Sequence, residues 1–156
     1  MGMLHNIQQG IAKRLLSDPW MTGIDVVTQA DGDLDTMIRS KLAALGIVAT
    51  IGMGKAGGAD PAASGPYFED VVFVIEVQEF VLKNRGPGGT RKPVLDVCER
   101  IASLLHHFQI PDGPGLYIAD PGIVPAIITP PATSAYSVAV QTSDGVYLDP
   151  SSIENQ

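Results

Sequence analysis

The sequence has little of what marks a secreted, membrane-spanning or strongly nucleic-acid-binding protein. It contains a single cysteine, Cys98, so no intramolecular disulfide can form, which fits a reducing compartment. The longest apolar run, Val71 to Ile75, is far shorter than the roughly 18 residues that a membrane-spanning helix needs. The first stretch, Met1 to Trp20, lacks the apolar core of a signal peptide, so we expect synthesis in the cytoplasm and no membrane partner.

Positive charge is also scarce. The formal net charge is −7, whereas proteins that hold nucleic acid through its phosphates carry a basic surplus. Bulk DNA binding is therefore not expected, although a local basic patch remains compatible with the composition.

Recognisable catalytic and metal-binding motifs are missing as well. The chain has no HExxH, CxxC or GxSxG pattern. His106 and His107 are adjacent, so on a helix they point about 100° apart and cannot chelate one metal ion together. Cys98 falls on an apolar helical stripe, which favours a buried, inert thiol over a nucleophile. We expect no metal, no cofactor and no enzymatic activity.

What the chain does have is a globular balance, with 45% hydrophobic residues separated by many glycines and prolines. Its length is that of one ordinary domain. We expect a single α+β domain over residues 1–150, followed by a polar tail over residues 151–156.

Apolar residues at helical spacing predict three helices. The first runs from about Leu4 to Ser17, and the second spans Asp31 to Gly46. In the second, Asp33 is the expected N-cap, and Gly46 suits the left-handed residue that follows a helix. The third is capped by Thr90 and continues to Phe108, with an apolar stripe at Val94, Val97, Cys98, Ile101, Leu104, Leu105 and Phe108.

Strands are expected between and after these helices, at residues 23–29, 47–51, 67–83, 116–119, 124–128 and 136–141. Strands outnumber helices, and two of them follow each other without a helix between. This order favours an α+β fold with a mixed, mainly antiparallel sheet of about 4–5 strands and about three helices packed on one face.

The strand that begins at Tyr67 has the strongest pattern. Its first half is apolar on both faces and its second half is not, which predicts that it starts in the sheet centre and leaves the body as an arm near Lys83. Glu76 and Glu79 fall on opposite faces of this strand. They therefore cannot converge on one substrate as an acid–base pair.

The segment from Gly52 to Pro66 is rich in glycine, alanine and proline, and we expect a loop. Gly52 to Gly57 matches GxGxxG, but no helix follows, as a nucleotide-binding loop would require. A second function nevertheless stays open, namely a small-molecule or anion-binding module. It would use this glycine-rich loop or the helix entrance at Gly86 to Thr90.

A cluster of positive charge stands out in an otherwise acidic chain. Four of the ten basic residues lie within ten positions, at Lys83, Arg85, Arg91 and Lys92. Three interpretations remain open: a solvated connection, a docking patch that meets an acidic face of another subunit, or a patch that faces a DNA channel. The candidate acidic residues for docking are Glu69, Asp70, Glu76 and Glu79.

Four stretches of this chain resemble small tail proteins of long-tailed bacteriophages and prophages, most closely the tail terminator or tail completion class. They are Gly65–Asp70 (GPYFED), the strand through Glu76–Glu79 (EVQE), the stretch Asn84–Asp96 (NRGPGGTRKPVLD) and Leu104–His106 (LLH). The resemblance covers Asp33 to roughly Gln109.

The resemblance implies a virion structural protein without catalytic residues or cofactor. Proteins of this class are α+β subunits that assemble in the host cytoplasm into hexameric rings. The rings cap the tail tube and present a surface to the head. The partners implied are further copies of the chain, other tail and head-joining proteins, and DNA that passes through the ring. The arm from Phe68 to Thr90 would then contact the neighbouring subunit.

Overall fold

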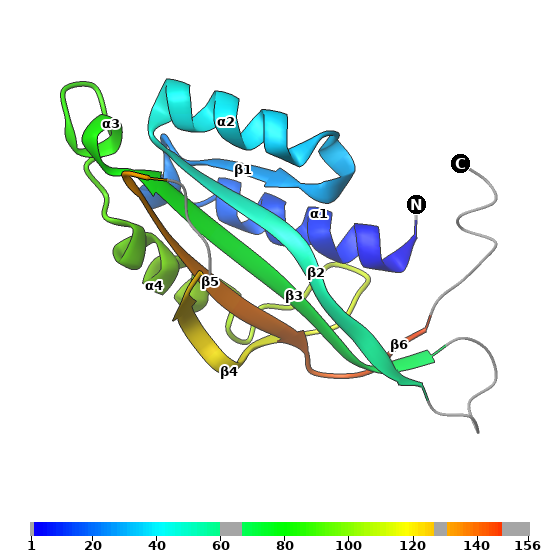
Figure 1. Cartoon of the computed structure of the whole chain (residues 1–156). Helices are drawn as coiled ribbons and strands as arrows, with labels where there is room; N and C mark the ends of the chain where they lie inside the picture. Colours follow the sequence, from blue (N-terminus) through cyan, green and yellow to red (C-terminus); the bar gives the residue numbers. More distant parts are fainter. Residues whose placement is uncertain (1, 60–66, 127–130, 148–156) are drawn as a thin grey trace.

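A computed structural model describes residues 2–59, 67–126 and 131–147. The element order is α1 (Met3–Leu16), β1 (Asp25–Thr28), α2 (Leu34–Leu45), β2 (Ile47–Ala59), β3 (Tyr67–Phe80), α3 (Val81–Arg85), α4 (Val94–Leu105), β4 (Leu116–Pro125), β5 (Thr133–Thr142) and β6 (Val146–Tyr147), with short 3₁₀ turns at Pro19–Met21 and Gln29–Asp31. Figure 1 shows a long β2–β3 hairpin crossing the molecule diagonally, with the helices set around it. The predicted α+β class is confirmed.

The strands form one mixed sheet of six strands in the order β1-β2-β3-β5-β4, and β6 pairs with the far end of β3. The β1–β2 pair is parallel, and every other strand pair is antiparallel. The expectation of a mixed, mainly antiparallel sheet is therefore confirmed. The strands expected at 116–119 and 124–128 belong to one strand, β4, and β6 was not expected, because it falls in a polar stretch with little strand signal.

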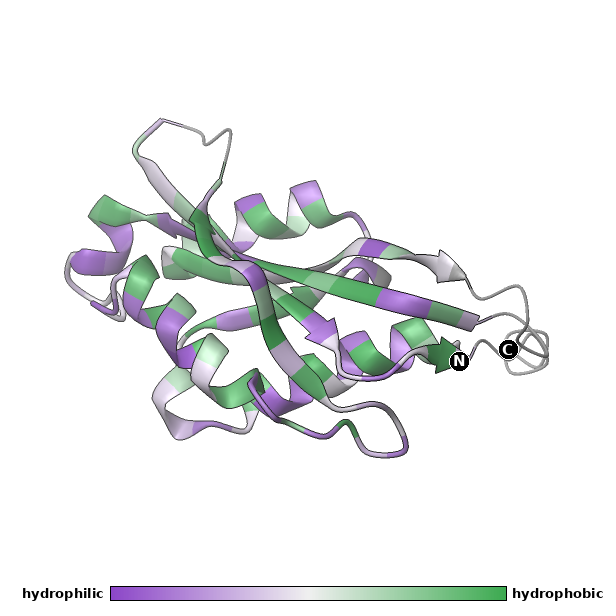
Figure 2. Ribbon diagram, turned by 90° about the horizontal axis from the view of Figure 1, so that it is seen from below, coloured by the Kyte–Doolittle hydropathy of each residue, from purple (hydrophilic) through white to green (hydrophobic). Residues whose placement is uncertain are grey.

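The core lies between one face of the sheet and the two helices α1 and α4. Both helices carry apolar residues at intervals of three and four, and these positions are the buried ones. Figure 2 shows green and purple alternating around the helices, as expected for elements with a single buried side. Phe73, Ile75 and Val77, which share one face of β3, are fully buried on this side of the sheet.

Helix α2 lies on the opposite face of the sheet, so the expectation of helices on one face is wrong. Its ends are as the sequence predicts: the Asp33 carboxylate accepts a hydrogen bond from the Asp35 N–H, and Gly46 is left-handed with φ 83°. None of its residues is buried, however. The apolar stripe of an amphipathic helix shows that the helix packs against something, but it does not show on which side of the sheet the helix lies.

The glycine-rich segment is a strand where the sequence predicted a loop. Gly52 to Ala59 continues β2, and its register with β3 runs to the pair Ala59 and Phe68, with an irregularity between Met53 and Lys55. Glycine has a weak intrinsic strand preference, so the pairing with β3 decides the conformation here. Residues 60–66 of the expected loop lie outside the described residues.

The β3 strand also differs from its prediction in which end projects. Near Phe80 it is flanked on both sides, by β2 and by β5. Its beginning at Tyr67 and Phe68 instead pairs with β2 and the short β6. In Figure 1 this end of the hairpin runs beyond α2 and β1. The arm is thus the start of β3, because that end lacks long neighbouring strands.

The segment after β3 is more ordered than a simple exposed loop. Val81–Arg85 forms the single turn α3, and Asn84 within it is fully buried. Helix α4 begins at Val94 with Pro93 as its N-cap residue, so Thr90 is not the cap. The expected polar tail at 151–156 lies outside the described residues.

Candidate assembly surfaces

The basic cluster is organised around Glu79, one of the candidate acidic residues for docking. Its side chain is fully buried, so Glu79 does not lie on the surface of the isolated subunit. One carboxylate oxygen accepts hydrogen bonds from Asn84 Nδ2 at 2.6 Å and Arg85 Nε at 3.0 Å. The other accepts from Arg85 Nη2 and from the Val94 N–H, both at 3.2 Å. The carboxylate is therefore fully occupied inside its own subunit.

These contacts also determine the charge state of Glu79. Burial on its own raises the pKa of a carboxyl group. In Glu79 the hydrogen bonds from Arg85, Asn84 and the Val94 N–H outweigh burial, so the pKa lies below its usual value. The pKa of Arg85 is raised, chiefly by its hydrogen bond to Glu79. The pair is ionised at neutral pH and joins the end of β3 to the start of α4.

Asn84 holds the rest of this turn in place. Its side chain donates to the Lys92 carbonyl at 2.9 Å and accepts from the Thr90 hydroxyl. Two glycines allow this close packing: a Cβ at Gly46 would stand 2.6 Å from the Asn84 nitrogen, and one at Gly89 only 2.0 Å from its carbonyl oxygen. We define Glu79, Asn84, Arg85, Thr90 and Val94 as the Glu79 cluster.

The four basic residues therefore have different roles. Arg85 belongs to the Glu79 cluster, and the Lys92 ammonium donates to the Trp20 and Thr22 carbonyls and lies 4.8 Å from the centroid of the Trp20 ring. Lys83 and Arg91 are exposed and form no ion pair within the described residues. These two remain available to a partner.

An exposed leucine accompanies them. The Leu82 side chain on α3 is 76% exposed, more than any other large apolar residue that the structure describes. Lys83 follows it in the chain, so α3 carries an exposed apolar side chain and an exposed cation that leave the helix about 100° apart. We define Leu82, Lys83 and Arg91 as the basic corner.

The candidate acidic residues lie elsewhere. Glu69 is exposed on the projecting end of the hairpin. Asp70 beside it is 3.7 Å from Lys55 on β2 and accepts a hydrogen bond from Gln141 at 3.4 Å. Asp70 is thus partly satisfied within the subunit, whereas Glu69 forms no ion pair in the described part of the chain.

Glu76 lies on the face of the sheet opposite the core, where α2 covers only part of the surface. It lines two hollows of this face, together with Val74. One, of about 350 Å³, lies between α2 and the sheet; the other, of about 560 Å³, extends over β5 towards the end of β4. We call them together the open-face groove.

The groove is mainly apolar and carries negative charge. Leu34, Ile38 and Val74 line it along with the carboxylates of Asp35 and Glu76, and no lining residue is basic. Thr50 also lines it. That side chain is only 8% exposed, and its hydroxyl has no hydrogen-bond partner among the described residues. An unsatisfied buried hydroxyl is uncommon in native proteins. This oxygen has almost no exposed surface, so it is not accessible from the groove.

Neither of the two anion-binding positions considered from the sequence has the geometry that binding would need. Gly52 to Gly57 forms a strand, without the turn and helix that hold a phosphate. At the start of α4 the Val94 N–H already donates to Glu79. The helix entrance therefore has an internal anion in the position that a ligand would take.

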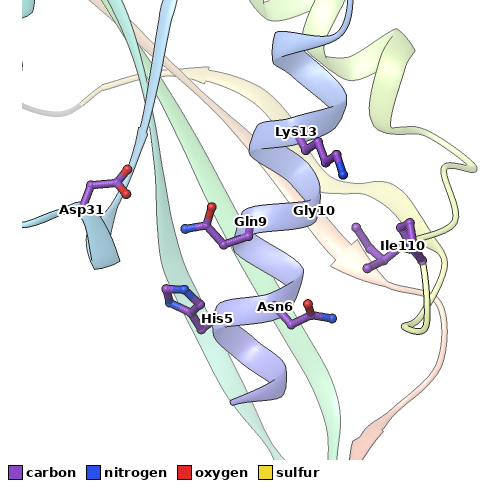
Figure 3. Close-up of a pocket in the computed structure, with 8 residues that line it drawn as sticks. His5, Asn6, Gln9, Gly10, Lys13, Asp31 and Ile110 are labelled. Atoms are coloured by element: carbon purple, nitrogen blue, oxygen red, sulfur yellow. The ribbon is translucent and has the colours of Figure 1, made fainter. Parts of the chain in front are cut away.

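A third hollow lies beside α1, shown in Figure 3, where His5 and Gln9 face the 3₁₀ turn that holds Asp31. Two of its polar side chains are paired within the chain: Gln9 Nε2 donates to Thr28 Oγ1 at 3.3 Å, and Asp31 accepts a hydrogen bond from the Thr28 N–H at 2.8 Å. The first bond joins α1 to β1, and the second holds the 3₁₀ turn against the end of β1.

Other reactive side chains are accounted for by packing. Burial raises the pKa of Cys98 to about 12, in agreement with the expected inert thiol. His106 accepts a hydrogen bond from the Ile118 N–H at its Nδ1, which joins the end of α4 to β4. The described residues contain no group of three or more His, Cys, Asp or Glu side chains that could hold a metal ion.

Sequence reasoning missed three features of these surfaces: the exposed Leu82, the unpaired Thr50 hydroxyl and the buried Asn84. Only Leu82 could have been noticed in the sequence, where it is an apolar residue adjacent to the basic cluster. The burial of Asn84 and the isolation of Thr50 depend on residues distant in the chain.

No protein-family model and no curated protein matches this chain. None of the helices in the described part is long and apolar enough to cross a membrane.

Proposed function

We propose that this protein is a ring-forming subunit of a phage tail, of the tail terminator or tail completion class. Its role is the assembly of the virion, through contacts with further copies of itself and with tail and head-joining proteins. The resemblance in the stretches from Gly65 to His106 suggests this class. The surfaces of the subunit provide the physical argument.

The observation that carries the proposal is the separation of charge on one subunit. The basic corner lies at the Phe80 end of β3, whereas Glu69 lies near its Tyr67 end. A strand of 14 residues places these ends roughly 40 Å apart. Exposed positive and negative charge thus lie on different surfaces of one subunit. Contacts between unlike surfaces are heterologous, so they repeat from subunit to subunit and close into a ring when the rotation allows it.

The projecting hairpin supports the same arrangement. Beyond the pair of Thr28 and Ile51, no described strand pairs with β2 on its β1 side. A strand edge of this kind presents backbone groups to a neighbouring chain. An assembly of several copies would cover this edge.

The first experiment measures the mass of the full chain in solution and images it by negative-stain electron microscopy. We expect a concentration-dependent ring whose mass is a multiple of 16.4 kDa. A strict monomer at the highest soluble concentration, with no ring on the grid, would contradict the proposal.

The second experiment tests the place in the tail. A tail-tube protein of a long-tailed phage is allowed to polymerise with increasing amounts of the subunit. A terminator shortens the tubes and is found at their ends. An oligomer that neither binds tube ends nor changes tube length would support ring formation but not a terminator role.

A further inference from the structure

The open-face groove and the basic corner have matching chemistry. The groove offers apolar side chains and two carboxylates, and it has no basic lining residue. The basic corner offers an exposed leucine on α3, and Lys83 and Arg91 are exposed cations close to it in the chain. We infer that the basic corner of one subunit docks into the open-face groove of the next copy. This inference rests on the proposed ring and assigns its interface.

The apolar part of the contact is Leu82. Because its side chain is 76% exposed in the isolated subunit, it keeps a large apolar area in water. In the groove, α2 leaves Leu34 and Ile38 only half-buried. Inserting Leu82 between α2 and Val74 covers both exposed surfaces at once.

The charged part of the contact is Lys83 against Glu76. Glu76 accepts a hydrogen bond from Gln78 at 2.8 Å and forms no ion pair within the described residues. It lies at the junction of the two hollows, so a cation that enters either one meets it. Asp35 lies at the α2 side of the same groove and adds to the negative potential.

Charge reversal gives the main test, measured on the full chain by sedimentation velocity. Lys83→Glu and Glu76→Lys each place like charges across the contact, so each variant alone is expected to associate at least tenfold more weakly than the unmodified protein. Mixed together, the two variants restore opposite charges at every interface of an alternating ring. Recovery of the assembly only in the mixture is the result expected from this contact.

Matched controls separate this contact from general surface effects. Lys13→Glu reverses an exposed charge on α1, and Leu16→Ser is a control for Leu82→Ser, since Leu16 is also exposed, at 57%. The controls should assemble normally. Leu82→Ser should weaken assembly while circular dichroism and the melting temperature stay close to those of the unmodified subunit.

Covalent capture gives a second measurement. Because Cys98 is buried, a Leu82→Cys/Ile38→Cys double variant has two exposed or half-exposed thiols, one on each side of the proposed contact. Mild oxidation should give a ladder of disulfide-linked oligomers, whereas either single variant gives none. A double variant that stays monomeric on denaturing gels, from protein that is oligomeric in solution, would count against the contact.

The outcomes distinguish this inference from the proposed function. If the unmodified protein forms rings and the charge reversals in the groove leave them intact, the groove contact is wrong and the ring remains. If Glu69→Lys, rather than Glu76→Lys, complements Lys83→Glu, the basic corner docks on the hairpin instead. If the unmodified protein never associates, both proposals fail.

Discussion

Replacing Glu79 by glutamine should destabilise the subunit, because this carboxylate connects β3, α3 and α4 from a fully buried position. The variant Glu79→Gln keeps the size of the side chain and removes its charge. An amide has one accepting oxygen, and its NH₂ group must face Arg85, Asn84 or the Val94 N–H, all of which donate.

The expected loss follows from the contacts with Arg85. Two charge-assisted hydrogen bonds are lost, each contributing roughly 1.5–3 kcal/mol. The Arg85 side chain is 48% exposed and regains water, so we expect about 2–3 kcal/mol of unfolding free energy to be lost at neutral pH. For a domain of this length the loss lowers the melting temperature by roughly 5–10 °C.

The pH dependence makes the test specific. The pKa of Glu79 is lowered in the folded protein, so its contribution is fully present above the unfolded pKa of about 4.3. It is lost as the pH falls through the lower folded value. The difference between the unmodified protein and Glu79→Gln should therefore be largest at neutral pH and shrink below about pH 4.

The assay is urea unfolding followed by circular dichroism at several pH values, with Glu69→Gln as the control. Glu69 is an exposed acid on the same strand, so its replacement should change stability by less than about 0.5 kcal/mol. Equal stability of Glu79→Gln and unmodified protein at pH 7 would refute the reasoning. So would a deficit that stays constant down to acidic pH, since it could not come from the charge.

Three further predictions concern packing. Gly46→Ala should lower the unfolding free energy by more than about 2 kcal/mol in urea unfolding, because the new Cβ would stand 2.6 Å from the Asn84 nitrogen. Gly88 also has a positive φ, but a Cβ there would meet nothing within 4 Å, so the control Gly88→Ala should cost about 1 kcal/mol. Equal costs for the two variants would refute the packing argument. Cys98, with a pKa of about 12, should react with a thiol reagent at pH 8 only when the protein is unfolded, and rapid labelling of folded protein would contradict its burial. Thr142→Val should raise stability by up to about 1 kcal/mol in the same unfolding assay, since it removes a buried hydroxyl without a partner; a loss of stability would indicate that a partner exists.

Local pattern was enough for elements whose buried side is set by residues close in the chain. The stripe from Val94 to Leu105 predicted α4, and Asp33 and Gly46 predicted both ends of α2. In each case neighbouring residues determine the outcome.

The glycine-rich half of β2 could not be predicted in this way. Residues 52–59 have little intrinsic preference for a strand and become one because β3 supplies a paired edge. The side of the sheet on which α2 lies was equally hidden, since an apolar stripe packs on either face. The open-face groove could not be predicted either, because it forms only when α2 packs on that side of the sheet.

The sequence by itself determined the α+β class, three of the helices and the concentration of positive charge between Lys83 and Lys92. Tertiary structure alone decided which of those charges are free. Arg85 is held by the buried Glu79 and Lys92 by backbone carbonyls near Trp20, whereas Lys83 and Arg91 stay exposed beside Leu82. The physical reason is that the sequence shows how many charged side chains a segment contains. Which of them are free to contact a partner depends on the residues that folding brings next to them.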